Sequence, residues 1–343
     1  WIASGEIKVL IGTHALIQDR VRFKKLGFVV VDEQHRFGTE QRHRILDKRS
    51  INPLPHFLSM SATPIPRTLA LTLYGDLDLS LIDEMPPGRK PVKTKVVFPD
   101  ERKEIYEFIR NEIKNGAQAF VVCPRIEDKS FDANYRLPAG SWQQRMDWSD
   151  VKSVKAEFKK LSEEIFPDLK IGIIHGKLTP KEKEKVMQSF RDGKLDILVA
   201  TSVVEVGVDI PNASIMVIEG GEKFGLATLH QFRGRVGRKG QEAYCFVFTT
   251  SADQGGLRRL KALEGTKTGF ELAEYDLQYR GPGELAGKRQ WGVSDIGMEA
   301  LKNIKMVEAA RAEAARIIDE DHELKKYPLL KERVEKIGVL HFE

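Results

Sequence analysis

The sequence predicts an α/β fold built on parallel sheets, with a helical region towards its C-terminal end. Short apolar runs bounded by Gly, Asp or Ser recur along the chain, and such runs are typical of buried parallel strands. Stretches with helical spacing lie between them, so that strands alternate with helices. At 343 residues the chain is long enough for two or three domains.

A first region, residues 1–88, alternates strand-like and helix-like stretches. Its predicted strands are VLIGT (9–13), FVVVDE (28–33) and HFLSMSAT (56–63), and its predicted helices cover 36–48 and 66–74. The Pro- and Gly-rich, basic segment MPPGRKPV (85–92) is typical of a linker. We place the interdomain linker at residues 89–96.

A second region, residues 97–250, repeats this pattern. Strands are predicted at 93–98, 117–124, 170–176, 196–202, 214–220 and 243–249, and helices at 101–115, 151–166 and 181–192. The polar stretch 128–150 lacks periodicity and is expected to be an inserted surface loop. A third region, 251–343, holds the Gly-rich segment EYDLQYRGPGELAGKRQWG (274–292) and a charged helical tail over 297–336.

Composition excludes several classes of protein. Hydrophobic residues make up 41% of the chain and charged residues 31%, which favours packed cores over disorder. The net charge of +5 is compatible with a polyanionic partner. No apolar run approaches the roughly 18 residues that span a bilayer, so we expect a cytoplasmic protein with no membrane partner. Cys123 and Cys245 have no zinc-like spacing and are expected to be buried thiols.

Two adjacent carboxylates, Asp32 and Glu33, follow the apolar run FVVV. In an open parallel sheet, ligands lie beyond the carboxyl ends of the strands, which is where a nucleotide site would place acids. One carboxylate there could hold Mg²⁺ through its waters, and the next could orient or deprotonate an attacking water. A solvated strand end or a helix cap would give the same pattern.

Polar residues also follow three other predicted strands. The hydroxyls of Ser61 and Thr63 in SATP (61–64) could relay hydrogen bonds between a nucleotide site and a nucleic-acid track, although a plain turn would use the same residues. Further candidates are Gly207 and Asp209 in TSVVEVGVDIP (201–211), and His175 in HGKL (175–178), for which a structural role is the alternative.

The segment QFRGRVGRKG (231–240) interleaves Arg233, Arg235 and Arg238 with glycines. The planar guanidinium matches phosphate, and glycine permits close backbone approach. An arginine from a neighbouring domain can stabilise the charge of phosphoryl transfer, an effect of about 10³–10⁵ in rate. A solvated basic loop, or one that only binds a phosphate backbone, would have the same composition. A small-molecule kinase would not need this cluster so far downstream of the acids.

Taken in order, these segments resemble the motifs of superfamily-two helicases. DEQH (32–35) is similar to their motif II, SAT (61–63) to motif III, TSVVEVGVDIP to motif V and QFRGRVGR (231–238) to motif VI. GTHALI (12–17) resembles motif Ib, and HGKL lies where an early DNA-contacting motif of the second domain belongs. The resemblance implies two RecA-like domains that hydrolyse ATP between them.

Longer segments resemble the RecG family in particular. These are VDEQHRFG (31–38), MSATPIPRTLALTLYGDLDLSLIDEMPPGR (60–89) and residues 274–292. The last of these segments resembles the TRG motif, a helical hairpin and loop. The related Mfd translocases are the alternative, but they usually read DEEQRFG where this chain has Gln34 and His35. The implied fold is therefore two RecA-like parallel-sheet domains, the first truncated at its N-terminal side, a TRG hairpin and a helical tail.

Two departures from the family pattern matter. No GxxxxGK[ST] sequence occurs, so we expect the ATP-binding P-loop and the family's wedge domain upstream of Trp1, and no ATPase activity from the chain alone. Tyr279 stands where the TRG motif has threonine, although Arg280 and Gly281 are retained.

By resemblance, each candidate residue has an expected role, with ATP and Mg²⁺ as cofactors. Asp32 would hold Mg²⁺ through water and Glu33 would activate water. The residues that reach the nucleotide from the second domain would be Gln231, Arg235 and Arg238, with Arg238 as the arginine finger, and Gly207 and Asp209 would line the cleft. Coupling would involve Gln34, His35, Ser61, Thr63, Arg280 and Gln290.

The resemblance implies a motor that moves on duplex DNA and remodels branched DNA, reversing stalled forks and migrating Holliday junctions. Its DNA contacts would be to phosphates and independent of sequence, with candidates Thr13, Arg67, His175, Lys177 and Thr201. We expect a monomer, with a single-stranded-DNA-binding protein as a candidate partner. A catalytically silent DNA-binding module is the alternative for the chain alone.

Overall fold

The computed structural model describes residues 1–18, 21–33, 55–62, 78–82, 84–124, 153–201, 210, 212–237, 240–250, 254–266, 268–276 and 304–337. These residues form two compact units. The first unit holds the described residues up to Asp78 together with 304–337, and the second holds those from Leu79 to Asp276. The predicted helices 36–48 and 66–74 and the predicted loop 128–150 lie outside the described residues.

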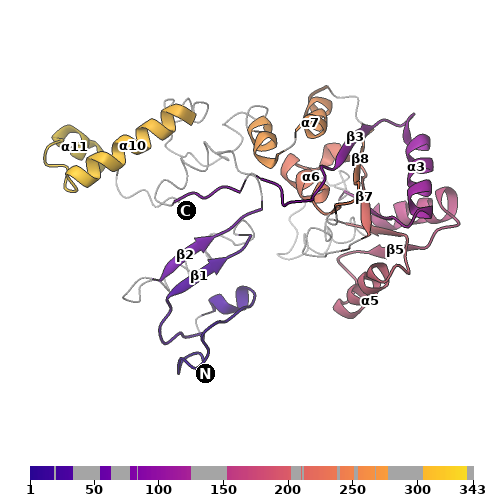
Figure 1. The fold of residues 1–343 in the computed structure, drawn as a ribbon, viewed down its shortest axis with the longest axis horizontal. Coiled ribbons are helices and arrows are strands. Elements are labelled where there is room, and N and C mark those ends of the chain that lie inside the picture. The colour runs from indigo at the N-terminus through magenta and orange to yellow at the C-terminus, as the bar shows by residue number, and fades with distance from the viewer. Residues whose placement is uncertain are drawn as a thin grey trace, which may run out of the picture. The chain divides into compact units, whose positions relative to one another are not determined.

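The first unit contains a two-stranded parallel sheet (Figure 1). Strand β1, Phe28–Val31, pairs with β2, His56–Ser59, so that Val31 lies opposite Ser59. Both strands were predicted as buried, but Phe28 and Val30 on one face of β1 are 58% and 48% exposed.

The predicted strand at residues 9–13 is wrong, because this segment has no strand geometry. A strand needs a hydrogen-bonded neighbour, and the described sheet of this unit consists of β1 and β2 alone. The apolar side chains therefore remain on the surface, with Ile11 91% exposed. A short 3-10 helix, His14–Ile17, follows this segment.

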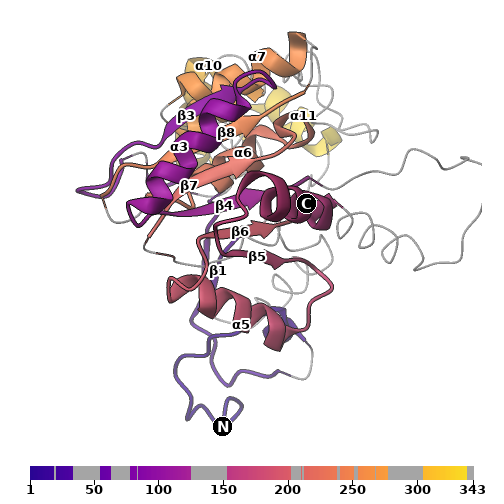
Figure 2. The same cartoon turned by 90° about the vertical axis from the view of Figure 1, so that its right-hand side faces the viewer.

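The second unit is built on six parallel strands in the order β3-β8-β7-β4-β6-β5 (Figure 2). All six predicted strands of the second region are confirmed. Their bounds are β3 Lys93–Val97, β4 Gln118–Val122, β5 Ile171–Ile174, β6 Ile197–Ala200, β7 Ala213–Ile218 and β8 Tyr244–Phe248. The first of them begins at Lys93, inside the range assigned to the linker.

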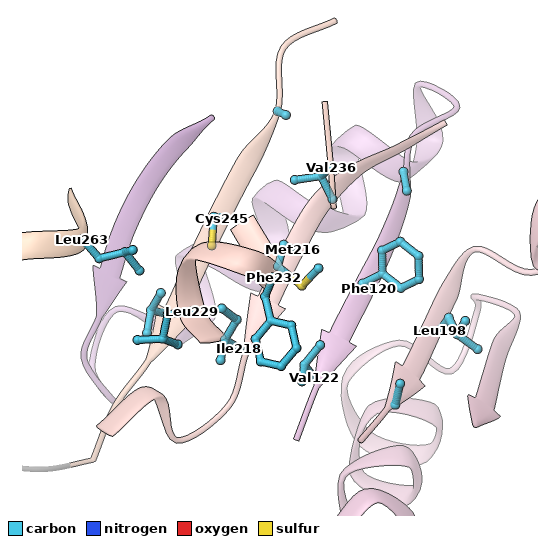
Figure 3. Packing of buried hydrophobic residues seen from close by; sticks show 14 of the residues in the cluster. Phe120, Val122, Leu198, Met216, Ile218, Leu229, Phe232, Val236, Cys245 and Leu263 are labelled. Carbon is cyan, nitrogen blue, oxygen red and sulfur yellow. The ribbon is translucent and has the colours of Figure 1, made fainter. Parts of the chain in front are cut away.

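Side chains alternate between the two faces of this sheet, and both faces are buried. In β4, Phe120 and Val122 join one core, whereas Ala119 and Val121 join the other. Helices α6 (Leu226–Arg233) and α7 (Gln254–Gly265) cover the first face, and α3 (Arg102–Lys114) covers the second (Figure 1). On the first face, Phe232 of α6 stands beside Val122 and the neighbouring strand residue Ile218 (Figure 3). Burial on both faces explains why the central strands β4, β6 and β7 are almost wholly apolar.

Helix α3, Arg102–Lys114, follows directly from the sequence pattern. Ile105, Ile109 and Ile113 recur every fourth residue, which places them on one face of a helix, and all three are buried. This stripe packs against the second face of the sheet.

Helix α5, Pro180–Arg191, begins with a capping box. The Thr179 side chain accepts a hydrogen bond from the backbone N of Glu182, and the Glu182 carboxylate accepts one from the backbone N of Thr179. Pro180 occupies the first turn, where its missing N–H costs nothing. The predicted helix 181–192 is therefore confirmed, with its start fixed by local hydrogen bonds.

The remaining helices differ in length, from eight residues in α6 to 17 in α10. Residues 153–160 are helical and continue into a π-helical turn, Leu161–Ile165, as the prediction for 151–166 requires. The others are α6 Leu226–Arg233, α7 Gln254–Gly265, residues 269–276, α10 Ile304–Glu320 and α11 Pro328–Ile337. The predicted helical tail is thus broken at 321–327, where Leu324 has a φ of 55°. None of the described helices is long and apolar enough to cross a membrane.

Polar side chains tie the elements of the second unit together by bonding to buried backbone groups and neighbouring loops. The Nε2 of Gln118 donates to the carbonyl oxygens of Phe190 (2.6 Å) and Leu195 (2.7 Å), which joins β4 to the end of α5 and the loop before β6. On the edge strand β3, the backbone N of Val96 donates to the Glu264 carboxylate of α7. Both bonds involve polar groups that would otherwise be costly to bury. Cys123 and Cys245 are free and buried, as predicted.

An ion pair lies where β7 ends. Arg102 Nη2 is 3.1 Å from Glu219 Oε2, and both side chains are mostly buried. Burial and the nearby Glu157 carboxylate raise the pKa of Glu219 to about 7, against the opposing charges of Arg102 and Lys160. The removal of the Glu219 carboxylate from water therefore affects its pKa more than the opposing charge of Arg102 does.

Gln118→Ala should destabilise the fold by about 2–3 kcal/mol, because it leaves two inward-facing carbonyl groups without their donor. Urea denaturation followed by circular dichroism measures this change. Gln188→Ala is the matched control, because Gln188 is an exposed residue of α5. Its effect should stay within about 0.5 kcal/mol. Equal losses in both variants would contradict the role given to Gln118.

Glu219 should make stability fall as the pH rises. Its pKa is higher in the folded state than the ordinary 4.5, so the stabilising proton is fully bound below about pH 4.5 and is lost as the pH passes about 7. The difference corresponds to on the order of 3 kcal/mol at about 1.36 kcal/mol per pH unit. Denaturation between about pH 5 and 8 should show this slope in the wild type and a flatter one in Glu219→Gln.

Glu242→Gln serves as the control for this measurement. Glu242 is exposed, and its hydrogen bond with Lys93 lowers the pKa of the carboxyl instead of raising it. This variant should keep the wild-type slope over the same pH range. A Glu219→Gln profile that parallels the wild type would mean that another group carries the pH dependence.

Candidate functional site

The acidic pair lies at the carboxyl end of β1. Because β1 and β2 are parallel, Asp32 and Ser61 follow neighbouring strands at the same edge of the sheet. The backbone N of Met60 donates to the carbonyl oxygen of Val31 at 2.8 Å and extends this alignment beyond Ser59. Asp32 is exposed and Glu33 is partly exposed, so a ligand could reach both carboxylates.

Glu33 has an unusual backbone. Its φ of 51° lies in the left-handed region, which is costly for a residue with a side chain. The backbone N of Glu33 donates to Asp32 Oδ1 at 2.9 Å. Its carboxylate oxygen Oε2 lies 3.5 Å from the backbone N of Ala62, a long contact with the SAT segment. The structure thus brings the predicted motif II acid beside the predicted motif III.

The donor set at this strand end suits a magnesium ion bound largely through water. Mg²⁺ prefers one or two carboxylates together with waters and phosphate oxygens. Asp32 supplies an exposed carboxylate at this position. Among the described residues no group of three or more His, Cys, Asp or Glu could enclose a metal, so a closed all-protein site is not formed by them.

Helix α6 positions the second group of candidates. Leu229 and Phe232 are buried against the sheet, whereas Gln231 between them is partly exposed. After α6 ends, the backbone N of Arg235 donates to the carbonyl oxygen of Phe232 at 3.0 Å, and Val236 is fully buried. Arg235 is partly exposed between these two anchors.

Glycine is required at Gly237. Its φ of 74° lies in the left-handed region, and a Cβ there would lie 2.7 Å from that of Ala243. The chain therefore turns tightly immediately before Arg238, which lies outside the described residues.

Arg233 differs from its neighbours in the cluster. It is 7% exposed, and its Nη1 donates to the carbonyl oxygens of Leu263 (2.9 Å) and Thr266 (3.0 Å) at the end of α7. Its Nη2 lies 2.8 Å from His230 Nδ1. Burial, followed by the charge of Arg233, lowers the pKa of His230 to about 4, so His230 is neutral and can accept this bond. Arg233 therefore joins α6 to α7, a role that the sequence pattern did not reveal.

Two of the predicted DNA-contacting residues lie at one edge of the second unit's sheet. His175 follows β5 and Thr201 follows β6, and these strands pair so that Ile174 lies opposite Ala200. Both residues are buried, with 7% and 2% exposure. Burial, together with the charges of Lys155, Lys183 and Lys177, lowers the pKa of His175.

Lys177 and Thr13 are exposed, unlike His175 and Thr201. Lys177 lies two residues before the Thr179 cap of α5. Thr13 precedes the short helix His14–Ile17, in the other unit, and its side chain makes no capping bond. The remaining candidates lie outside the described residues: Gln34, His35, Thr63, Arg67, Gly207, Asp209, Arg238, Arg280 and Gln290.

Three protein families match the chain. Residues 1–72 match the DEAD/DEAH box helicases, residues 101–240 match the helicase conserved C-terminal domain, and residues 266–337 match the C-terminal part of domain 3 of the ATP-dependent DNA helicase RecG. The third match agrees with the resemblance to RecG drawn from the motif II spelling and the TRG-like segment.

Individual relatives are similar over nearly the whole chain. The ATP-dependent DNA helicase RecG of Thermotoga maritima is 48% identical over 324 residues, which cover 94% of this chain and 39% of that protein. The RecG of Synechocystis is 45% identical over 98% of this chain and 39% of its own length. The chain thus spans about two fifths of these relatives.

A solved structure also agrees with the fold. The structure of RecG bound to a three-way DNA junction is 45% identical, covers 90% of this chain and 37% of that chain, and has a TM-score of 0.63. The predicted RecA-like α/β fold is therefore confirmed. The helix 269–276, α10 and α11 lie within the range matched to RecG domain 3, and α7 precedes it. The chain is therefore RecG-like: it is homologous, over most of its length, to proteins named ATP-dependent DNA helicase RecG.

Proposed function

We propose that this chain supplies the motor of a translocase that hydrolyses ATP and moves on duplex DNA, remodelling branched DNA such as stalled forks and Holliday junctions. The observation that carries this proposal is the placement of Glu33, whose strained backbone directs its carboxylate towards the SAT segment. Strain of this kind persists where function requires it. The similarity to RecG proteins over 94% of the chain supports the same activity.

The acids would carry out the chemistry of hydrolysis. Asp32 holds Mg²⁺ through water, and the ion, when bound, neutralises charge on the phosphate oxygens. Glu33 orients the attacking water and accepts its proton. Gln231, Arg235 and the finger Arg238 would contact the phosphates, because guanidinium groups stabilise the charge that develops on them.

Coupling would pass through residues that follow the acids in the sequence, through the SAT segment and through the TRG-like segment. The contact between Glu33 and Ala62 supports a link from the water-activating acid to Ser61 and Thr63. The residues proposed for coupling are Gln34, His35, Ser61, Thr63, Arg280 and Gln290. Gly207 and Asp209 are proposed to line the nucleotide site.

DNA would be held by its phosphates. Lys177 is exposed, and the charges of Lys155, Lys183 and Lys177 all act on His175, which marks a positive region at the start of α5. Such a region attracts a polyanion irrespective of sequence. Thr13, Arg67, His175 and Thr201 complete the proposed contacts.

Glu33→Gln in the full-length protein should abolish ATP-driven unwinding of a three-way junction. Loss of a general base lowers the rate by about 10²–10⁴, while junction binding should remain within about twofold because the amide keeps the shape of the carboxylate. Rates of ATP turnover and strand separation measure the change. Glu104→Gln, at an exposed position of α3, is the matched control and should retain activity.

Two further outcomes separate the alternatives. Displacement of stalled RNA polymerase without junction unwinding by the wild type would favour the Mfd-type activity. The 343-residue chain alone should bind DNA without DNA-stimulated ATP turnover, because ATP phosphates are held chiefly by P-loop amides and lysine in such motors. Turnover that rises with added duplex would overturn that expectation.

Lys177→Ala should weaken duplex binding equally for unrelated sequences and reduce the salt dependence of affinity by about one unit of log–log slope. Fluorescence anisotropy at several salt concentrations measures both quantities. Lys114→Ala is a suitable control, because Lys114 is exposed at the end of α3. A slope unchanged from the wild type in Lys177→Ala would remove this lysine from the phosphate contacts.

A further inference from the structure

The segment before β3 makes a defined turn. The backbone N of Arg89 donates to the carbonyl oxygen of Pro86 at 3.2 Å, and Gly88 has a φ of 80°. Proline at the second position and glycine with positive φ at the third are the requirements of a type II turn. The sequence PPGR (86–89) therefore fixes the direction in which Arg89 leaves the turn.

This turn lies against the loop that follows α6, and three contacts show it. Arg89 Nη2 donates to the carbonyl oxygen of Gly234 at 2.9 Å. A Cβ on Gly237 would lie 3.8 Å from Val92 Cγ2, and one on Gly240 would lie 2.6 Å from the carbonyl oxygen of Gly88. Residues 88–92 thus run alongside residues 234–237 and Gly240, and we refer to this pairing as the turn–loop contact.

In the turn–loop contact, backbone atoms as well as side chains approach one another closely. Gly240 has a φ of 72°, so both its conformation and its approach to Gly88 require the absence of a side chain. The charge of Arg89 also contributes to the low pKa of His230, which places the guanidinium near the C-terminal end of α6. Beyond this point, Lys93 N donates to the carbonyl oxygen of Ala243 at 2.8 Å and begins the pairing of β3 with β8.

We propose that Arg89 is a positioning residue for the arginine-bearing loop: its hydrogen bond to Gly234 fixes the loop that presents Arg235. The proposal rests on the proposed function, in which Arg235 stabilises the transferring phosphate. A charge-assisted bond to a carbonyl at the start of the loop limits how far the loop can move. Displacement of a catalytic group by about 1 Å can cost on the order of 10²-fold in rate.

Arg89→Ala in the full-length protein is the test, with two readouts. In hydrogen exchange, amides of residues 234–237 should exchange about tenfold faster, because the lost bond to a charged donor is worth roughly that factor. In DNA-stimulated hydrolysis, kcat should fall by about 10- to 100-fold with the KM for ATP within about twofold. Arg89→Lys keeps a charged donor group, so its amide exchange at 234–237 and its kcat should both lie between those of the wild type and Arg89→Ala.

Arg110→Ala is the matched control. Arg110 is also partly buried and donates to a backbone carbonyl, that of Ile165, at 2.6 Å, on the opposite face of the sheet from α6. It should leave exchange at 234–237 and kcat at wild-type values. Unchanged exchange in Arg89→Ala, faster exchange without loss of kcat, or equal effects of Arg110→Ala would each overturn the proposal. A wild type without DNA-stimulated hydrolysis would instead refute the proposed function, and exchange would still decide whether Arg89 holds the loop.

Discussion

Burial of both faces of the six-stranded sheet is the constraint on which the rest of the second unit depends. Residues such as Phe120 and Ala119 point to opposite cores, so the central strands β4, β6 and β7 have no exposed face on which chemistry could be placed. Polar and charged groups are therefore found where strands end, as with His175, Thr201 and Glu219. Asp32 also follows a strand, β1, although one face of that strand is exposed. A parallel-sheet fold of this kind separates the residues that stabilise it from those at its strand ends.

Much of this organisation could be predicted from the sequence, because it is local. The spacing of Ile105, Ile109 and Ile113 predicts α3, and Thr179 with Glu182 predicts the start of α5. The residues of the motifs predicted a resemblance to RecG, and the similarity to RecG proteins agrees with this prediction. The roles of the motif residues remain proposals, several of them outside the described residues.

What could not be predicted depends on contacts between distant segments. Arg233 and Arg235 stand two residues apart in one motif, yet Arg233 is buried against carbonyl groups some thirty residues later, whereas Arg235 is partly exposed. Arg89 lay in a segment interpreted only as a linker, and its partner Gly234 is 145 residues away. Periodicity likewise predicted a strand at residues 9–13, because apolar spacing carries no information about whether a neighbouring strand exists.

The bond from Val96 to Glu264 has a consequence for how the sheet meets other molecules. β3 is the last strand on its side, and the outward N–H of such a strand is a template on which another chain can add a strand. Here the carboxylate of α7 occupies that donor and sets a negative charge along the border. α7 thus blocks a backbone donor through which the edge strand β3 could pair with another sheet. A shortened protein that ends after β8 would expose this donor while its hydrophobic strands stayed intact, and would be prone to self-association.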